Sequence, residues 1–161
     1  MSTGVRIEPW SAADRPLLGA LLGDRVMTEH LGGPESPDKL ASRQARYEAA
    51  GSRQYRIVDA EGRSIGYVGY WERAMPWEVA WEVGWAVLPG FQGRGHATTA
   101  MTLLLDVIRA DEPRPVHAFP SVDNAASNAV CRKLGFQNLG AFDFEYPPGN
   151  PIRCNDWRLE P

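Results

Sequence analysis

The chain has 161 residues, of which 43% are hydrophobic and 23% charged, and this fits a single globular domain over residues 1–161 with a sizeable core. Its mild net charge of −3 argues against nucleic acid as a partner. Two cysteines and three scattered histidines argue against a disulfide framework and a metal site, and the lack of an apolar span or signal core predicts a cytoplasmic protein without a membrane partner.

The first half of the sequence predicts a strand, two helices and three strands. Their expected bounds are residues 5–10, 11–22, 36–50, 54–59, 64–71 and 78–87. The last strand has the clearest pattern, because large apolar residues alternate strictly with small residues and carboxylates. One of its faces therefore carries Glu78 and Glu82 among alanines and a glycine.

The second half predicts a helix, a strand, a second helix and two final strands joined by a Pro-Pro-Gly-Asn turn. Their expected bounds are residues 95–109, 115–119, 124–134, 136–146 and 152–159. Antiparallel runs followed by strand-helix-strand units indicate an α/β (α+β) fold with a mixed sheet. The count gives about seven strands flanked by about four helices.

Residues 88–97 (Leu-Pro-Gly-Phe-Gln-Gly-Arg-Gly-His-Ala) link the clearest strand to a helix. Glycines at 90, 93 and 95 allow a tight turn with bare amides, and a helix N-terminus adds unpaired N–H groups and a positive dipole end. Such a loop suits a pyrophosphate. A Walker-type loop is excluded because His96 and Ala97 follow the last glycine, and Thr98 departs from the dinucleotide fingerprint.

Two motifs give the sequence its family resemblance. Gln92, Gly95 and Ala97 fit the pattern Gln/Arg-x-x-Gly-x-Gly/Ala, and Asn124-x-x-Ser127 leads to Gly-Phe at 135–136. Together with the order of elements, they resemble the GNAT superfamily of N-acetyltransferases, whose sheet is mainly antiparallel. The Glu-Val-Gly-Trp stretch before the loop is most similar to the members that acetylate the N-termini of ribosomal proteins. Acetyl-CoA is the co-substrate that this resemblance implies, with no metal.

The resemblance also implies which residues bind the coenzyme. The pyrophosphate is expected on the backbone amides of Gln92, Gly93, Arg94, Gly95, His96 and Ala97. Pantetheine is expected along Trp85, Ala86 and Val87 in the manner of an added strand, and near Asn124. Asn124 is also expected to cap its helix.

Transfer to an amine requires a base for the ammonium proton and an acid for the leaving thiolate. Glu82 is the first candidate for the base and Glu78 the second, although either carboxylate could instead form a structural ion pair. For the acid the candidates are Ser127 and Cys131. Many GNAT members have a tyrosine where this chain has Cys131, so the departure puts the acid in doubt. Helix capping by Ser127 and simple burial of Cys131 stay as alternatives.

The sequence leaves the acceptor open between the amine of a protein N-terminus and that of a small molecule such as an antibiotic, polyamine or amino acid. A non-catalytic acyl-CoA-binding module is the alternative from another class. The resemblance implies that residues 26–33 and 146–153 form the acceptor walls. The residues expected to line an apolar, mainly aromatic cleft there, or else to form core or homodimer contacts, are Trp71, Met75, Trp77 and Tyr146.

Overall fold

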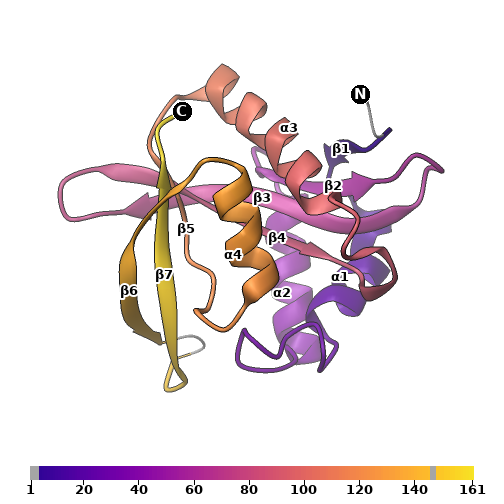
Figure 1. Ribbon diagram of the computed structural model, residues 1–161. Coiled ribbons are helices and arrows are strands. Elements are labelled where there is room, and N and C mark those ends of the chain that lie inside the picture. Colours follow the sequence, from indigo (N-terminus) through magenta and orange to yellow (C-terminus); the bar gives the residue numbers. More distant parts are fainter. Residues whose placement is uncertain (1–3, 146–147) are drawn as a thin grey trace.

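A single seven-stranded sheet organises the protein, as a computed structural model shows for residues 4–145 and 148–161 (Figure 1). The strand order is β1-β2-β3-β4-β5-β7-β6. The strands are β1 (Arg6–Pro9), β2 (Gln54–Val58), β3 (Ser64–Ala74), β4 (Val79–Val87), β5 (Val116–Ala118), β6 (Gln137–Glu145) and β7 (Pro151–Leu159). All neighbours pair antiparallel except β4 and β5. The predicted mixed, mainly antiparallel sheet is therefore confirmed.

In the part of the chain that the structure describes, four α-helices cover the two faces of this sheet. They are α1 (Arg15–Leu22), α2 (Pro37–Glu48), α3 (His96–Asp111) and α4 (Ala125–Lys133), with 3-10 turns at Ala12–Asp14 and Pro89–Phe91. Helices α3 and α4 lie on one face and α1 packs on the other, with α2 beside it (Figure 1). Ser36 starts α2 as predicted, because its hydroxyl accepts the Lys39 N–H at 3.2 Å.

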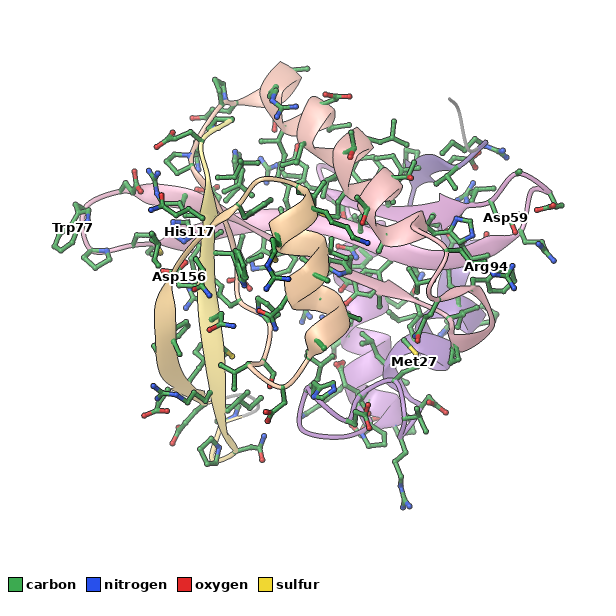
Figure 2. The ribbon with its side chains drawn as sticks, in the orientation of Figure 1. Met27, Asp59, Trp77, Arg94, His117 and Asp156 are labelled. Carbon is green, nitrogen blue, oxygen red and sulfur yellow. The ribbon has the colours of Figure 1, made fainter. Side chains whose placement is uncertain are left out.

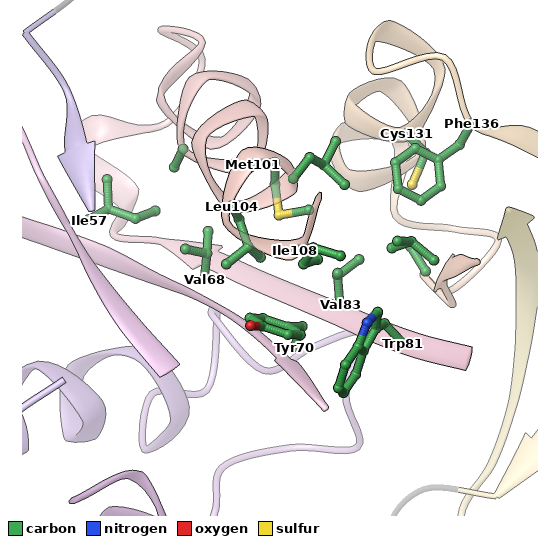
Figure 3. Packing of buried hydrophobic residues seen from close by; sticks show 14 of the residues in the cluster. Ile57, Val68, Tyr70, Trp81, Val83, Met101, Leu104, Ile108, Cys131 and Phe136 are labelled. Carbon is green, nitrogen blue, oxygen red and sulfur yellow. The ribbon is translucent and has the colours of Figure 1, made fainter. Parts of the chain in front are cut away.

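The main core fills the space between the sheet and helices α3 and α4 (Figure 3). Trp81, Val83 and Val87 of β4 point into it, as the period-two pattern predicts, and all three are buried. The indole of Trp81 also lies between two guanidinium groups, those of Arg53 at 4.7 Å and Arg114 at 4.4 Å from the ring centroid. The opposite face of β4 is thereby turned away from this core.

Strand β3 runs three residues beyond its predicted end at Trp71. The added residues include two charged side chains, Glu72 and Arg73. Both have partners in the structure, since Arg73 pairs with Glu82 and Glu72 pairs with Arg114. The longer β3–β4 hairpin projects from the body of the protein and carries Trp77 at its tip (Figure 2).

A side-chain hydrogen bond joins the sheet to the end of α3. The Tyr70 hydroxyl donates to Asp111 Oδ2 at 2.9 Å, while the tyrosine itself is buried. Tyr70→Phe keeps the ring and removes this bond, so we expect the free energy of unfolding to fall by about 1 kcal/mol. Urea unfolding measures the change, and Tyr55→Phe, on β2 beside the same core, is the matched control. Equal losses in both variants would contradict a specific role for the Asp111 bond.

Candidate active site

Strands β4 and β5 pair only briefly among the described residues, at Trp81↔Val116 and Glu82↔His117. Beyond Glu82, strand β4 continues to Val87 with β3 on one side only. A parallel pair that separates in this way leaves main-chain N–H and C=O groups of β4 facing a gap in the sheet. Glu82 therefore lies on the last paired rung, where the gap begins.

The main-chain hydrogen bonds show which residues of β4 face this gap. Trp81 N donates toward β5, to Pro115 O at 2.9 Å, whereas Leu88 N donates toward β3, to Ile65 O at 2.8 Å. Because main-chain direction alternates along a strand, Trp85 and Val87 share the direction of Trp81. Ala86 presents its main chain to β3, and its side chain packs against the core around α1. An extended chain in the gap would thus meet the backbone of residues 85 and 87.

The loop after β4 has the geometry of an anion cradle. Gly93 and Gly95 adopt φ angles of +75° and +80°, and a Cβ built on either would meet no atom within 4 Å, so the surface beside them is open. Gly95 is the N-cap of the 16-residue helix α3, whose first N–H groups have no acceptor within the helix. Gln92 Nε2 donates to Val87 O at 2.8 Å and fixes the start of the loop.

Three further residues, Arg94, His96 and Ala97, complete the loop and the first turn of α3. Arg94 is exposed beside the two glycines, while His96 and Ala97 form the first turn of α3 and are half-buried (Figure 2 labels Arg94). The loop therefore offers backbone donors, one cation and a positive helix end at one place. That combination fits the pyrophosphate of a coenzyme.

Helix α4 begins with Asn124, whose side-chain oxygen accepts the Ser127 N–H at 3.1 Å, as expected for an N-cap. Ser127 is half-buried in the first turn. Cys131 is different, because it has no exposed surface and lies in the main core (Figure 3). Burial raises the pKa of its thiol to about 12.

Asn128, to which the sequence pattern assigned no function, fixes the position of α4. Its amide donates to Ser121 O at 2.9 Å and to Asn124 O at 2.8 Å. Its oxygen accepts from Asn155 Nδ2 and from Trp157 Nε1, both at 2.8 Å. Because every hydrogen-bonding group of this buried amide is used, the start of α4 is held firmly against β7.

The carboxylate of Glu82 is largely buried, with a side chain that is 18% exposed. Burial raises the pKa of this carboxyl, and the nearby Arg73 guanidinium, whose Nη1 lies 2.9 Å from Oε1, acts in the opposite direction. The Trp71 side chain donates a further hydrogen bond to it. The structural ion pair that the sequence left open is thus present, yet the carboxyl is still easier to protonate than an exposed one.

Glu78 lies farther from the gap, near the start of β4. Its carboxylate is 3.7 Å from Arg158 Nη2, a distance at which the pair is weak. Its position at the far end of β4 from the loop keeps it second to Glu82 as a candidate base.

The sequence analysis did not predict three functional candidates, Arg73, His117 and Asp156, because the residues that they contact are remote in the chain. Arg73 contacts Glu82 from β3, and its guanidinium also lies 4.9 Å from the centre of the Phe119 ring. His117 and Asp156 form a buried pair, with Nδ1 2.6 Å from Oδ1 (Figure 2). His117 has Glu82 as its register partner on β4. No local periodicity could have joined residues that are 39 positions apart.

The two expected acceptor walls approach each other around a cavity of about 400 Å³. Residues 31–35, one side of α2 and Pro148 line it. Of the expected aromatic cleft, Trp71 lies across Gly84 on the Glu82 face, while Trp77 is 90% exposed at the hairpin tip. Met75 lies near that tip, and Tyr146 lies outside the described residues. The four residues expected to share a cleft are therefore not seen together.

Within residues 4–145 and 148–161, no three or more His, Cys, Asp and Glu side chains are grouped so that they could hold a metal ion. In the same ranges, no helix has both the length and the apolar character needed to cross a membrane.

The family to which the chain belongs is shown by its sequence. Residues 5–137 match the model of the acetyltransferase (GNAT) domain. The chain belongs to the GNAT acetyltransferase family. It is therefore an acyltransferase that uses acetyl-CoA as co-substrate, and the phosphate cradle after β4 agrees with that activity.

Individual relatives differ in what they acetylate. The chain is 30% identical, over 80% of its length and 77% of the relative's, to an L-methionine sulfoximine/L-methionine sulfone acetyltransferase of Pseudomonas paraeruginosa. Its fold is similar to the spermidine N-acetyltransferase of Vibrio cholerae in complex with CoA and spermine (TM-score 0.81, 18% identity, covering 99% and 96% of the two chains). It is also similar to the Salmonella typhimurium enzyme that modifies the N-terminal serine of ribosomal protein L7/L12 (TM-score 0.80, 22% identity, covering 99% and 96%).

Proposed function

We propose that this GNAT acetyltransferase transfers the acetyl group directly to the primary amine of a small, amino-acid-like molecule. The observation that carries the proposal is Glu82, a largely buried carboxylate on the rung where β4 and β5 separate. The curated relatives named for L-methionine sulfoximine and L-methionine sulfone support a small acceptor. The resemblance to ribosomal-protein acetyltransferases rests on fold alone at 22% identity or less.

Acetyl-CoA would be held by backbone groups that the loop, helix α3 and strand β4 leave accessible. The backbone of residues 92–97 and the N-terminus of α3 would bind the pyrophosphate, with Arg94 as a cation beside it. The main chain of Trp85 and Val87 would hold pantetheine in the gap, where β4 lacks a strand partner. Asn124 stands at the start of α4 and is assigned to the same region. This cradle would bring the thioester toward the rung that carries Glu82.

Glu82 would act as the base. The acceptor arrives as an ammonium ion, and its nitrogen becomes nucleophilic only after Glu82 takes one proton. A carboxyl with a raised pKa suits this task, because its basicity is closer to that of the amine it must deprotonate. The nitrogen then bonds to the acetyl carbon, the carbon–sulfur bond breaks, and the thiolate leaves with the electron pair. The acylated nitrogen loses its second proton in this step, and the thiolate takes up one proton to give the free thiol of CoA.

An amino-acid-like acceptor also carries a carboxylate, and the Glu82 face offers a cation for it. Arg73 contacts Glu82 and is 32% exposed, so its guanidinium retains donors that can reach solvent or a ligand. A cation next to the base would orient a molecule that presents an ammonium and a carboxylate together. A polyamine has no such carboxylate and would be repelled by Arg73.

Ser127 is the proposed acid, in preference to Cys131. Ser127→Ala should slow the chemical step about tenfold, whereas Cys131→Ala should leave it within about twofold, since the Cys131 thiol is enclosed in the main core while Ser127 is only half-buried. Single-turnover rates with saturating acetyl-CoA measure this, after coenzyme binding is checked by calorimetry. Cys131→Ala also controls for disturbance of α4. An unchanged Ser127→Ala rate would leave the thiolate to be protonated by solvent.

The acceptor class is tested by thiol release from acetyl-CoA with a panel of amines. The panel contains L-methionine sulfoximine, L-methionine sulfone, spermidine, an aminoglycoside and peptides that begin with Ser or Ala. We expect the two amino-acid derivatives to give a kcat/KM at least tenfold above the other amines, which corresponds to about 1.4 kcal/mol of transition-state stabilisation. Preference for a peptide would overturn the small-molecule proposal and favour a protein N-terminus.

A further inference from the structure

One buried polar pair near Glu82 has no evident structural purpose. His117 on β5 is 2% exposed, and its Nδ1 lies 2.6 Å from Asp156 Oδ1 on β7. Its other ring nitrogen, Nε2, is buried and has no hydrogen-bond partner among residues 4–145 and 148–161. A buried nitrogen without a partner costs free energy, so its retention calls for an explanation.

The sheet places this histidine on the same face as Glu82. His117 is the register partner of Glu82 across the parallel β4–β5 pair, and parallel partners project to the same side. The flanking residues of β5, Val116 and Ala118, point into the opposite core. The His117 ring stacks on Phe119 at 5.7 Å between centroids, and Arg73 lies over the same phenylalanine. Glu82, Arg73 and His117 therefore belong to one cluster.

Asp156 determines what the free nitrogen can do. An ionised carboxylate can only accept a hydrogen bond, so the Nδ1–H group donates to Asp156, and the neutral ring carries its hydrogen on Nδ1 and a lone pair on Nε2. The same carboxylate stabilises the imidazolium that forms if Nε2 takes up a proton. The pair is thus arranged as a proton acceptor whose accepting atom points away from Asp156.

We propose that His117, oriented by Asp156, receives the proton that Glu82 removes from the acceptor amine. The inference rests on the proposed role of Glu82. The ammonium gives one proton to the Glu82 carboxylate, the resulting carboxylic acid passes it through one bridging water to His117 Nε2, and Glu82 becomes a carboxylate again. The imidazolium later returns the proton to solvent. His117 acts through Glu82 and does not touch the substrate.

The charges around Glu82 must be included in any test by pH. The groups that face it come from three strands: Trp71 and Arg73 from β3, His117 from β5, and Cys154 and Asp156 from β7. The Glu78–Arg158 pair lies farther along the same face. The single variants at His117 and Asp156 each change one member of this set and leave the others in place.

His117→Asn keeps a donor for Asp156 and removes proton acceptance at Nε2. We expect kcat to fall about tenfold, the acceptor KM to stay within about twofold, and the acidic limb of the kcat profile to change shape. Asp156→Asn should reduce kcat by a smaller factor. If His117 and Glu82 act in series, the double variant with Glu82→Gln should be no slower than Glu82→Gln alone. Tyr70→Phe, on the opposite face, controls for lost stability.

A readout without substrate keeps this inference separate from the proposed function. In NMR spectra of the whole protein, the neutral His117 ring should carry its proton on Nδ1, and Asp156→Asn should shift the tautomer equilibrium toward Nε2. A wild-type rate for His117→Asn, multiplicative effects in the double variant, or a wild-type ring that carries its proton on Nε2 would overturn the proposal. If His117→Asn does not fold, the Asp156→Asn rate and the NMR tautomer decide. Absence of acetylation with every amine would instead count against the proposed function.

Discussion

Glu82→Gln is expected to lower kcat at neutral pH by roughly 10²-fold. The amide keeps the size of the side chain and can still hydrogen-bond within the cluster, but it cannot take a proton from the acceptor ammonium. Because the neighbouring Arg73 would lose its charged partner, stability is measured alongside by thermal unfolding. Steady-state assays with the best acceptor of the panel give kcat and KM for both proteins.

The pH dependence of the Glu82→Gln variant separates a base from a structural carboxylate. Burial raises the pKa of Glu82, so in the wild type this base is protonated and lost as the pH falls through that raised value. The acidic limb of kcat/KM should therefore be absent in the variant. At high pH the acceptor amine is already neutral, and the variant should recover part of its rate.

Glu78→Gln is the matched control for this experiment, because it changes another carboxylate on the same face of β4. We expect a rate within about threefold of the wild type, since its weak ion pair lies at the other end of the strand. If Glu78→Gln instead produces the large loss while Glu82→Gln does not, the two carboxylates exchange their assigned functions.

Local pattern was sufficient to predict the part of the site that lies on β4. Strict alternation from Val79 to Val87 predicts which side chains enter the core and leaves Glu82 on the other face, and the structure confirms this arrangement. The turn after β4 could be predicted equally well, because its positive φ angles require glycines at 93 and 95. Both features depend only on residues within one segment.

The partners of Glu82 could not be predicted in the same way. Arg73 lies beyond the predicted end of its strand at Trp71, and no local pattern indicates its pairing with Glu82 across the β3–β4 hairpin. The His117–Asp156 pair depends on how β5 and β7 align, and nothing local encodes that register. Cys131 lies on nearly the same helical side as Asn124, but α4 packs against the core closely enough to bury it completely.

Gly95→Asp is expected to weaken acetyl-CoA binding at least tenfold, or about 1.4 kcal/mol. Gly95 stands at the N-cap of α3, where the proposed pyrophosphate site needs bare amides and a positive field. An added carboxylate would compete for those N–H groups and repel the phosphates. A Cβ at this position meets no atom within 4 Å, so the cost to the fold is confined to the strain of a non-glycine residue at φ +80°, which thermal unfolding measures.

Two controls separate charge from backbone strain in this experiment. Gly95→Asn has the same shape and the same positive φ, of +80°, without the charge, so it should bind acetyl-CoA more tightly than Gly95→Asp. Gly62→Asp introduces the same charge at φ +81° in the β2–β3 turn and should leave affinity unchanged. Calorimetry at two salt concentrations measures all three variants, and the deficit of Gly95→Asp should shrink as salt screens the repulsion. A folded Gly95→Asp protein with wild-type affinity would show that the coenzyme phosphates bind elsewhere.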